Sequence, residues 1–94
     1  MDIKEYCDAL GLQLVLTRHS NQEGRWSARL HTCEFKSHPL SASLESTHGN
    51  GITCRAAVAD MVELIRGRVM VVNATSATDR REYRVPTDLS SDNV

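Results

Sequence analysis

The hydrophobic period changes along this chain, and that change constrains its fold more than any other feature. Apolar residues recur at helical spacing in residues 2–10 and again in 54–66, whereas residues 12–18 and 25–31 alternate between apolar and polar. Spacings of three and four residues are typical of an amphipathic helix, and strict alternation is typical of a half-buried strand. The chain is therefore predicted to have an α+β fold.

The first predicted helix has a capping signal at each end. Asp2 is a good N-cap residue, and Glu5 follows it at the spacing of a capping box. Gly11 suits the left-handed position that often ends a helix. We therefore expect a helix over residues 2–10.

The second predicted helix carries the stronger apolar stripe. Thr53 is its expected N-cap, and Gly67 is expected to end it after residue 66. The apolar stripe of this helix consists of Ala57, Val58, Met61, Val62, Leu64 and Ile65.

Five segments are predicted to be strands: 12–18, 25–31, 40–47, 69–72 and 81–85. Leu12, Leu14 and Leu16 are expected on one side of the first of them. The alternation changes parity near His31–Thr32, which predicts a bulge or a break there. Residues 48–51 are predicted to form a turn.

Short turns join the first three predicted strands, which favours one mostly antiparallel sheet with both helices on one face. The predicted order is α-β-β-β-α-β, with a final β at 81–85. Residues 1–86 are expected to form a single domain, and residues 87–94 a disordered C-terminal tail. A homodimer is an open alternative if the apolar strand Val69–Val72 lies at the sheet edge.

The composition excludes several classes of protein. The 94 residues contain no apolar run of the roughly 20 residues that span a membrane, and the N-terminus lacks the pattern of a signal peptide. The three cysteines are odd in number and unpaired in spacing, which favours a reducing compartment. We therefore expect a cytoplasmic protein.

Residues that could carry out catalysis are present but not arranged in a known pattern. His31, Cys33, His38, His48 and Cys54 lack the paired spacing of a zinc knuckle, so no metal site and no cofactor are predicted. Cys54 lies at a predicted helix start, where the helix dipole can activate a thiol. The chain is predicted not to be an enzyme, with a small cysteine- or metal-dependent enzyme as an alternative.

Basic residues occur in two rows on predicted strands. Eleven basic and twelve acidic residues give a net charge of −1, without the strongly basic character of a nucleic-acid binder. Nine of the eleven are arginine, the residue best suited to bidentate contacts at interfaces. The predicted partner-binding residues are Arg25, Arg29, His31, Arg80, Arg81 and Arg84.

A nucleic-acid-binding regulator is the alternative function. The order α-β-β-β-α, together with Glu5-Tyr6-Cys7 in the first predicted helix, resembles a double-stranded RNA-binding domain. That family needs a basic cluster at the start of its second helix to grip phosphates. Only Arg55 is present at the corresponding position here.

A second resemblance covers most of residues 2–86. It comprises Gly49-Asn50-Gly51-Ile52-Thr53, an alanine-rich helix, Arg80-Arg81-Glu82, Val85-Pro86 and the strand around Arg25-Trp26. On these residues the chain resembles a group of small phage and prophage accessory proteins. Cys54-Arg55 departs from the acidic or proline-containing helix start that is usual in that group.

The phage resemblance implies a function but no catalytic residues. It implies a non-enzymatic protein that binds a host protein in the bacterial cytoplasm and inhibits a defence complex such as CRISPR-Cas, as anti-CRISPR proteins do. This implication is an association with a family and not a consequence of the residues themselves.

Overall fold

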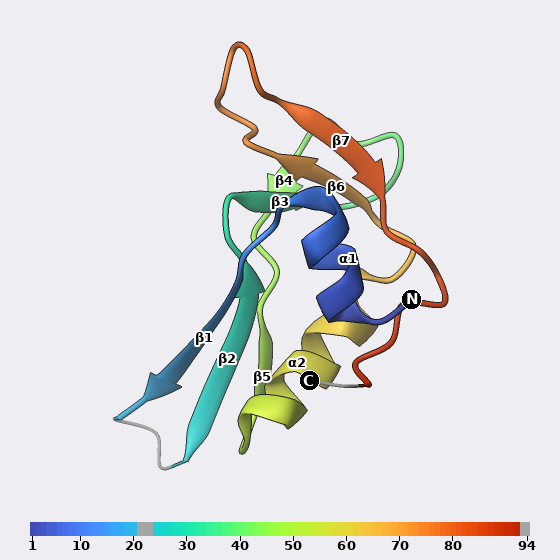
Figure 1. Cartoon of the computed structure of the whole chain (residues 1–94). Helices are drawn as coiled ribbons and strands as arrows, with labels where there is room; N and C mark the ends of the chain where they lie inside the picture. Colours follow the sequence, from blue (N-terminus) through green and yellow to red (C-terminus); the bar gives the residue numbers. More distant parts are fainter. Residues whose placement is uncertain (21–23, 93–94) are drawn as a thin grey trace.

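The computed structural model describes residues 1–20 and 24–92. It confirms an α+β fold, with two helices and two antiparallel sheets (Figure 1). In chain order the elements are α1 (Ile3–Leu10), β1 (Leu14–His19), β2 (Arg25–Leu30), β3 (Cys33–Lys36), β4 (Leu44–Glu45), β5 (Gly49–Gly51), α2 (Cys54–Ile65), β6 (Val69–Val72) and β7 (Arg81–Arg84). The predicted element order broadly matches, but strands β3 and β5 were not predicted.

The predicted single sheet is two sheets in the structure. The first has the strand order β1-β2-β5 and the second the order β4-β3-β6-β7. The chain passes from one to the other at the predicted break, where Thr32 adopts a left-handed backbone with φ 60°. The change of parity at the break lets Leu30 before it and Cys33 after it both be buried in the core.

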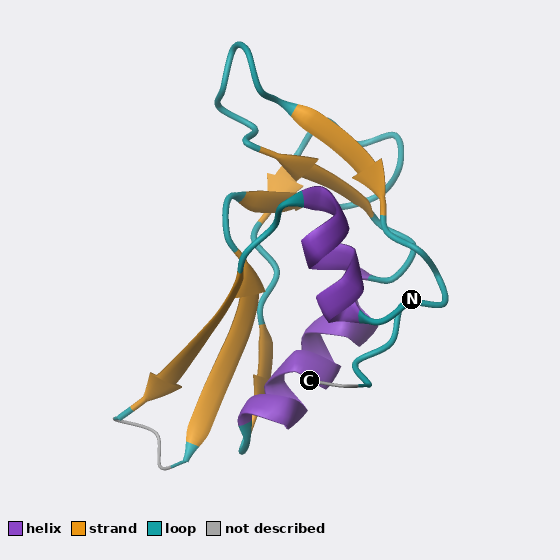
Figure 2. Ribbon diagram, in the orientation of Figure 1, coloured by secondary structure: helices purple, strands orange, loops and turns teal. Residues whose placement is uncertain are grey.

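Both helices lie on the same side of the first sheet and beneath the second (Figure 2). The predicted caps form: Asp2 Oδ1 accepts from the Glu5 backbone N–H at 2.8 Å, and Thr53 Oγ1 accepts from that of Ala56 at 3.0 Å. Gly11 ends α1 in a left-handed conformation. Buried side chains from both helices and both sheets form one core, which includes Ile3, Phe35, Met61, Ile65, Met70 and Val72.

The predicted turn at residues 48–51 was wrong, because Gly49–Gly51 form strand β5 beside β2. A Cβ on Gly49 would lie 2.2 Å from the backbone of Ala57 and Met61. A Cβ on Gly51 would lie 2.6 Å from the Ala57 nitrogen. The glycines therefore allow α2 to pack directly against the strand backbone.

Three further predictions were wrong in part. The predicted strand over 40–47 is reduced to Leu44–Glu45, and Leu40 is 93% exposed. The sequence pattern predicts Leu16 on the apolar side of its strand and Leu64 in the apolar stripe of its helix, yet these residues are 38% and 46% exposed. Alternation and helical spacing identify the face of an element, but only the neighbouring elements decide how far along it the core extends.

The expected tail and dimer strand also differ from the structure. Leu89 is fully buried, and the Ile3 backbone N–H donates to Ser90 O at 2.8 Å, so this part of the expected disordered tail packs against the core. Residues 93 and 94 lie outside the described residues. Strand β6 is paired on both sides, with β3 and β7, so it offers no edge for a dimer. Neither helix of the described chain is long and apolar enough to cross a membrane.

Candidate functional site

The predicted partner-binding residues fall into two groups on different sheets. Arg25 and Arg29 lie on β2 in the first sheet, and exposed His31 follows in the turn after it. Arg80, Arg81 and Arg84 lie on and beside β7 in the second sheet. The structure therefore does not bring all six residues into one row.

The first group lies on a sheet face that neither helix covers. Trp26, Ala28 and Leu30 face the helices, as predicted, so the alternate residues of β2 face outward. The register places seven side chains on this outer face: Val15, Thr17, His19, Arg25, Ser27, Arg29 and Asn50. None of the seven is acidic, so the outer face is cationic.

Arg25 and Arg29 have no partner among the residues that the structure describes. Within residues 1–20 and 24–92, neither guanidinium makes a hydrogen bond or an ion pair, although His19 Nε2 lies 3.0 Å from Ser27 Oγ between them. Their spacing of four residues along a strand corresponds to about 13 Å. Two unpaired, partly exposed cations on one rigid strand can therefore receive carboxylate or phosphate groups from a partner.

The second group is occupied by contacts within the molecule. Arg80 Nη1 lies 2.8 Å from Glu82 Oε2, and Lys36 Nζ lies 3.2 Å from Glu82 Oε1. Hydrogen bonds from Arg80 and Lys36 lower the pKa of the Glu82 carboxyl. Arg81 Nε lies 3.6 Å from Asp79 Oδ1, and Arg84 Nη1 donates to Gly67 O at 2.9 Å. Arg80 and Arg81 therefore have acidic partners, whereas Arg84 is held by a neutral backbone carbonyl.

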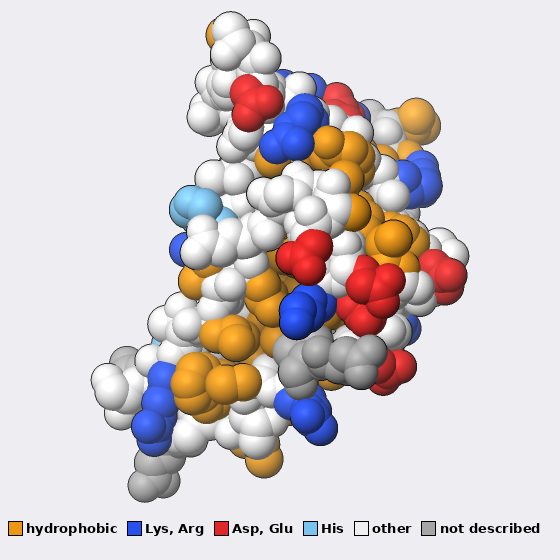
Figure 3. All heavy atoms as spheres, in the orientation of Figure 1, with side chains coloured by type: hydrophobic (Ala, Val, Ile, Leu, Met, Phe, Trp, Pro, Cys, Tyr) orange, Lys and Arg blue, Asp and Glu red, His pale blue; other side chains and the backbone are white. Residues whose placement is uncertain are grey.

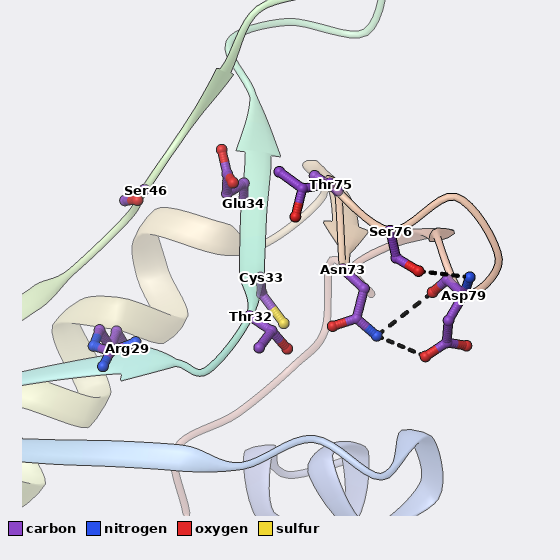
Figure 4. Close-up of a pocket in the computed structure, with 10 residues that line it drawn as sticks. Arg29, Thr32, Cys33, Glu34, Ser46, Asn73, Thr75, Ser76 and Asp79 are labelled. Atoms are coloured by element: carbon purple, nitrogen blue, oxygen red, sulfur yellow. Dashed lines mark hydrogen bonds between the residues drawn. The ribbon is translucent and has the colours of Figure 1, made fainter.

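A polar cavity of about 540 Å³ adjoins the first group, because Arg29 is one of its lining residues (Figure 4). Asn73, Ser76 and Asp79 from the β6–β7 loop gather on one side of it, and Asn73 Nδ2 donates to Asp79 Oδ2 at 2.7 Å. Thr32 and Cys33 line its floor. The cavity extends the outer sheet face toward the second sheet.

Two strained backbone residues meet at this cavity. Thr32 and Asn73 are the non-glycine residues with positive φ in the described chain, at 60° and 54°, and the Asn73 N–H donates to Thr32 O at 2.9 Å. Such a conformation is rare for a β-branched residue, and strain of this kind concentrates at binding sites. Sequence reasoning missed both residues, although asparagine after an apolar strand is a known left-handed signal.

No cysteine thiol is hydrogen-bonded to a histidine ring in the described residues. Burial raises the pKa of the Cys33 thiol to about 11, with Arg81 acting in the opposite direction, so this thiol stays protonated at neutral pH. Cys54 lies half-buried at the start of α2, and no hydrogen bond joins it to a histidine in the described chain. Nor do the described residues include a group of three side chains that could hold a metal ion.

The likeness to a double-stranded RNA-binding domain finds no support in the sheet topology. The strands that follow α1 are divided between two sheets, since β3 leaves β1 and β2 to pair with β6. Double-stranded RNA-binding domains need a basic cluster at the start of the second helix, and this chain has Arg55 alone at that position.

Comparison of the chain with known protein families, curated proteins and solved structures found no match.

Proposed function

We propose that this chain is a non-enzymatic protein-binding module that contacts its partner through the outer face of the first sheet. Arg25 and Arg29 are the principal binding residues, and His31 lies at the margin of the surface. One observation carries the proposal: two arginines stand on a sheet face that carries no acidic side chain and no covering helix, and neither has a hydrogen-bond or ion-pair partner within the described residues.

The physical argument rests on what these arginines do for the fold. Arg66, Arg68 and Arg84 each bond to a distant part of the chain, so their side chains contribute to the tertiary structure. Within the described residues, Arg25 and Arg29 make no such bond. Arginine is enriched among the residues that dominate binding energy, and its planar fork matches a carboxylate. A sheet also holds the two side chains more rigidly than a loop would.

The resemblance to phage and prophage accessory proteins supplies the class of partner. On that basis we propose a protein of the bacterial host, such as a component of a CRISPR-Cas defence complex, which the module would inhibit in the host cytoplasm. A nucleic acid is the second candidate, because the same cationic face would also attract phosphates.

The test is a tagged pull-down from bacterial lysate, with and without nuclease, read by mass spectrometry. We expect one stoichiometric host protein that survives nuclease and is lost with the double variant Arg25→Glu/Arg29→Glu. The matched control, Lys4→Glu/Arg80→Glu, makes the same charge change on α1 and beside β7 and should retain the partner. The ion pair that Arg80 loses is exposed, so that control should still fold.

Three results would contradict the proposal. Retention of the partner by the folded Arg25→Glu/Arg29→Glu variant would exclude the outer sheet face. Loss of the partner with the control variant would mean that binding depends on the total charge of the protein and not on the outer sheet face. Recovery of nucleic acid, with binding that falls steeply as salt rises, would favour the nucleic-acid alternative.

A further inference from the structure

The four sheet edges of this fold are not equally open. In the first sheet, β5 is closed by α2, because Asp60 Oδ2 accepts from the Asn50 backbone N–H at 2.8 Å. In the second sheet, β4 has only two residues, and β7 carries three charged side chains, Arg81, Glu82 and Arg84, each bonded within the chain. Short strands and charged strands resist further pairing. The remaining edge is β1, which is six residues long and has no described segment beside it (Figure 1).

The hydrogen-bond register shows which groups of β1 are available. The His31 backbone N–H donates to Gln13 O at 2.9 Å, which marks this pair as directly hydrogen-bonded across the hairpin. In an antiparallel ladder such pairs alternate, so Val15, Thr17 and His19 bond to β2. The N–H and C=O groups of Leu14, Leu16 and Arg18 therefore point away from the sheet.

The side chains along this edge differ on its two faces. On the face toward the helices, Leu16 is exposed beside Trp26, which is half-buried on β2. Figure 3 shows hydrophobic side chains beside Lys or Arg side chains over this β1–β2 hairpin. On the outer face, Arg25 and Arg29 stand one strand in from the edge. The face toward the helices is thus mainly apolar, with exposed Arg18 near the end of β1, and on the outer face the two arginines stand on β2 behind Val15, Thr17 and His19.

We propose that β1 receives an extended, acidic segment of the partner protein as an added antiparallel strand. Backbone hydrogen bonds to Leu14, Leu16 and Arg18 hold this segment. Its side chains alternate, with acidic residues toward Arg25 and Arg29 and apolar residues toward Leu16 and Trp26. This inference rests on the proposed function and names the kind of segment that the cationic face recognises.

Charge favours such a segment over a second copy of this chain. Residues 12–31 contain three arginines and two histidines against one glutamate. Pairing β1 with itself would bring two such cationic hairpins together, whereas an acidic strand neutralises one of them. The complementary partner is therefore acidic.

The experiment uses the full chain labelled with ¹⁵N and the capped peptide Glu-Val-Glu-Val-Glu-Val-Glu as the probe. One control peptide, Val-Glu-Glu-Glu-Glu-Val-Val, has the same composition without the alternation, and another has lysine in place of glutamate. We expect the alternating peptide to shift the amide resonances of Leu14, Leu16 and Arg18 most strongly. Both controls should bind at least about tenfold more weakly.

A backbone variant separates strand addition from simple charge attraction. Leu16→Pro removes an N–H that points away from the sheet, so the β1–β2 bonds remain, and proline is accepted on an edge strand. The matched control, Leu16→Ala, shortens the side chain but keeps the N–H. We expect Leu16→Pro to reduce peptide binding about tenfold and Leu16→Ala to reduce it less. If Leu16→Pro fails to fold, the resonance shifts and the control peptides still decide the question.

Several results would overturn the strand-addition inference. Equal binding of the three peptides, or shifts confined to β7 and the second sheet, would exclude it. A dimer in sedimentation that Leu16→Pro dissociates would assign the edge to a second copy. In the pull-down, a partner that is lost with Arg25→Glu/Arg29→Glu but retained with Leu16→Pro would leave the proposed function standing and remove this inference alone.

Discussion

At the scale of single residues, two buried thiols are the most perturbed groups in the core. Cys7 lies on α1 and Cys33 on β3, and both are almost inaccessible. Burial, then the neighbouring Cys33 thiol and Asp8, raise the pKa of Cys7 to about 11. Burial raises the pKa of Cys33 to a similar value. Their contribution to the structure is apolar packing rather than reactivity.

These thiols predict a loss of stability at alkaline pH. An unfolded thiol ionises near its ordinary pKa of 9.0, whereas the folded thiols hold their protons up to about 11. The unfolded state therefore binds fewer protons in this window, and the free energy of unfolding falls as pH rises from 9 to 11. Urea unfolding from pH 8 to 11 measures the effect. In a folded Cys7→Ala/Cys33→Ala variant, the free energy of unfolding should fall less between pH 9 and 11. An identical fall in the variant would show that the two thiols do not cause it.

At the scale of elements, the glycine strand β5 decides how α2 docks. A three-residue strand with glycine at both ends has little side chain to bury, and its place in the fold comes from the close approach of the helix backbone. The same approach lets Asp60 on α2 reach the Asn50 N–H and close that edge. Thus one close contact determines the packing of α2 and also closes the β5 edge of the first sheet.

Gly49→Ala is expected to be strongly destabilising. The new methyl group would lie 2.2 Å from the backbone of Ala57 and Met61, which belong to the helix and cannot rotate away. We expect a loss of about 3 kcal/mol or more, beyond the usual range for overpacking, measured by urea unfolding. The control Asn50→Ala lies between the two glycines, where its side chain is exposed, and should cost less than about 1 kcal/mol. Comparable losses for both variants would argue against the close contact.

At the scale of the whole molecule, the two ends of the described chain pack together. The Ile3 N–H donates to Ser90 O at 2.8 Å, and the Ser90 N–H donates to Met1 O at 3.1 Å. Arg66 Nε, just after α2, donates to Leu89 O at 2.6 Å, and the Leu89 side chain is fully buried. The C-terminal segment therefore closes the core over both helices.

Leu89→Ala is expected to reduce the free energy of unfolding by about 2–5 kcal/mol, the usual range for truncating a buried leucine. The control Asp88→Ala changes an exposed neighbour and should have little effect. Thermal and urea unfolding of the two variants measure the difference. Equal stabilities would mean that residues 87–90 are not part of the cooperative core.

The sequence alone determined the elements whose signals are local. The caps at Asp2 and Thr53, the stripe of α2 and the alternation of β2 depend on residues only a few positions apart. They could therefore be predicted without knowing the fold. The parity change at His31–Thr32 is also a local signal, and it marked the boundary between the sheets without revealing that there were two.

The tertiary structure decided everything that depends on distant neighbours. The role of Gly49 depends on the backbone of α2, and the burial of Leu89 depends on the N-terminal segment. The six predicted binding residues looked equivalent in sequence, yet Arg80 has an acidic partner while Arg25 and Arg29 have none in the described chain. Ion pairing and strand order join residues far apart in sequence, so only the folded chain shows which charges and which edge stay open.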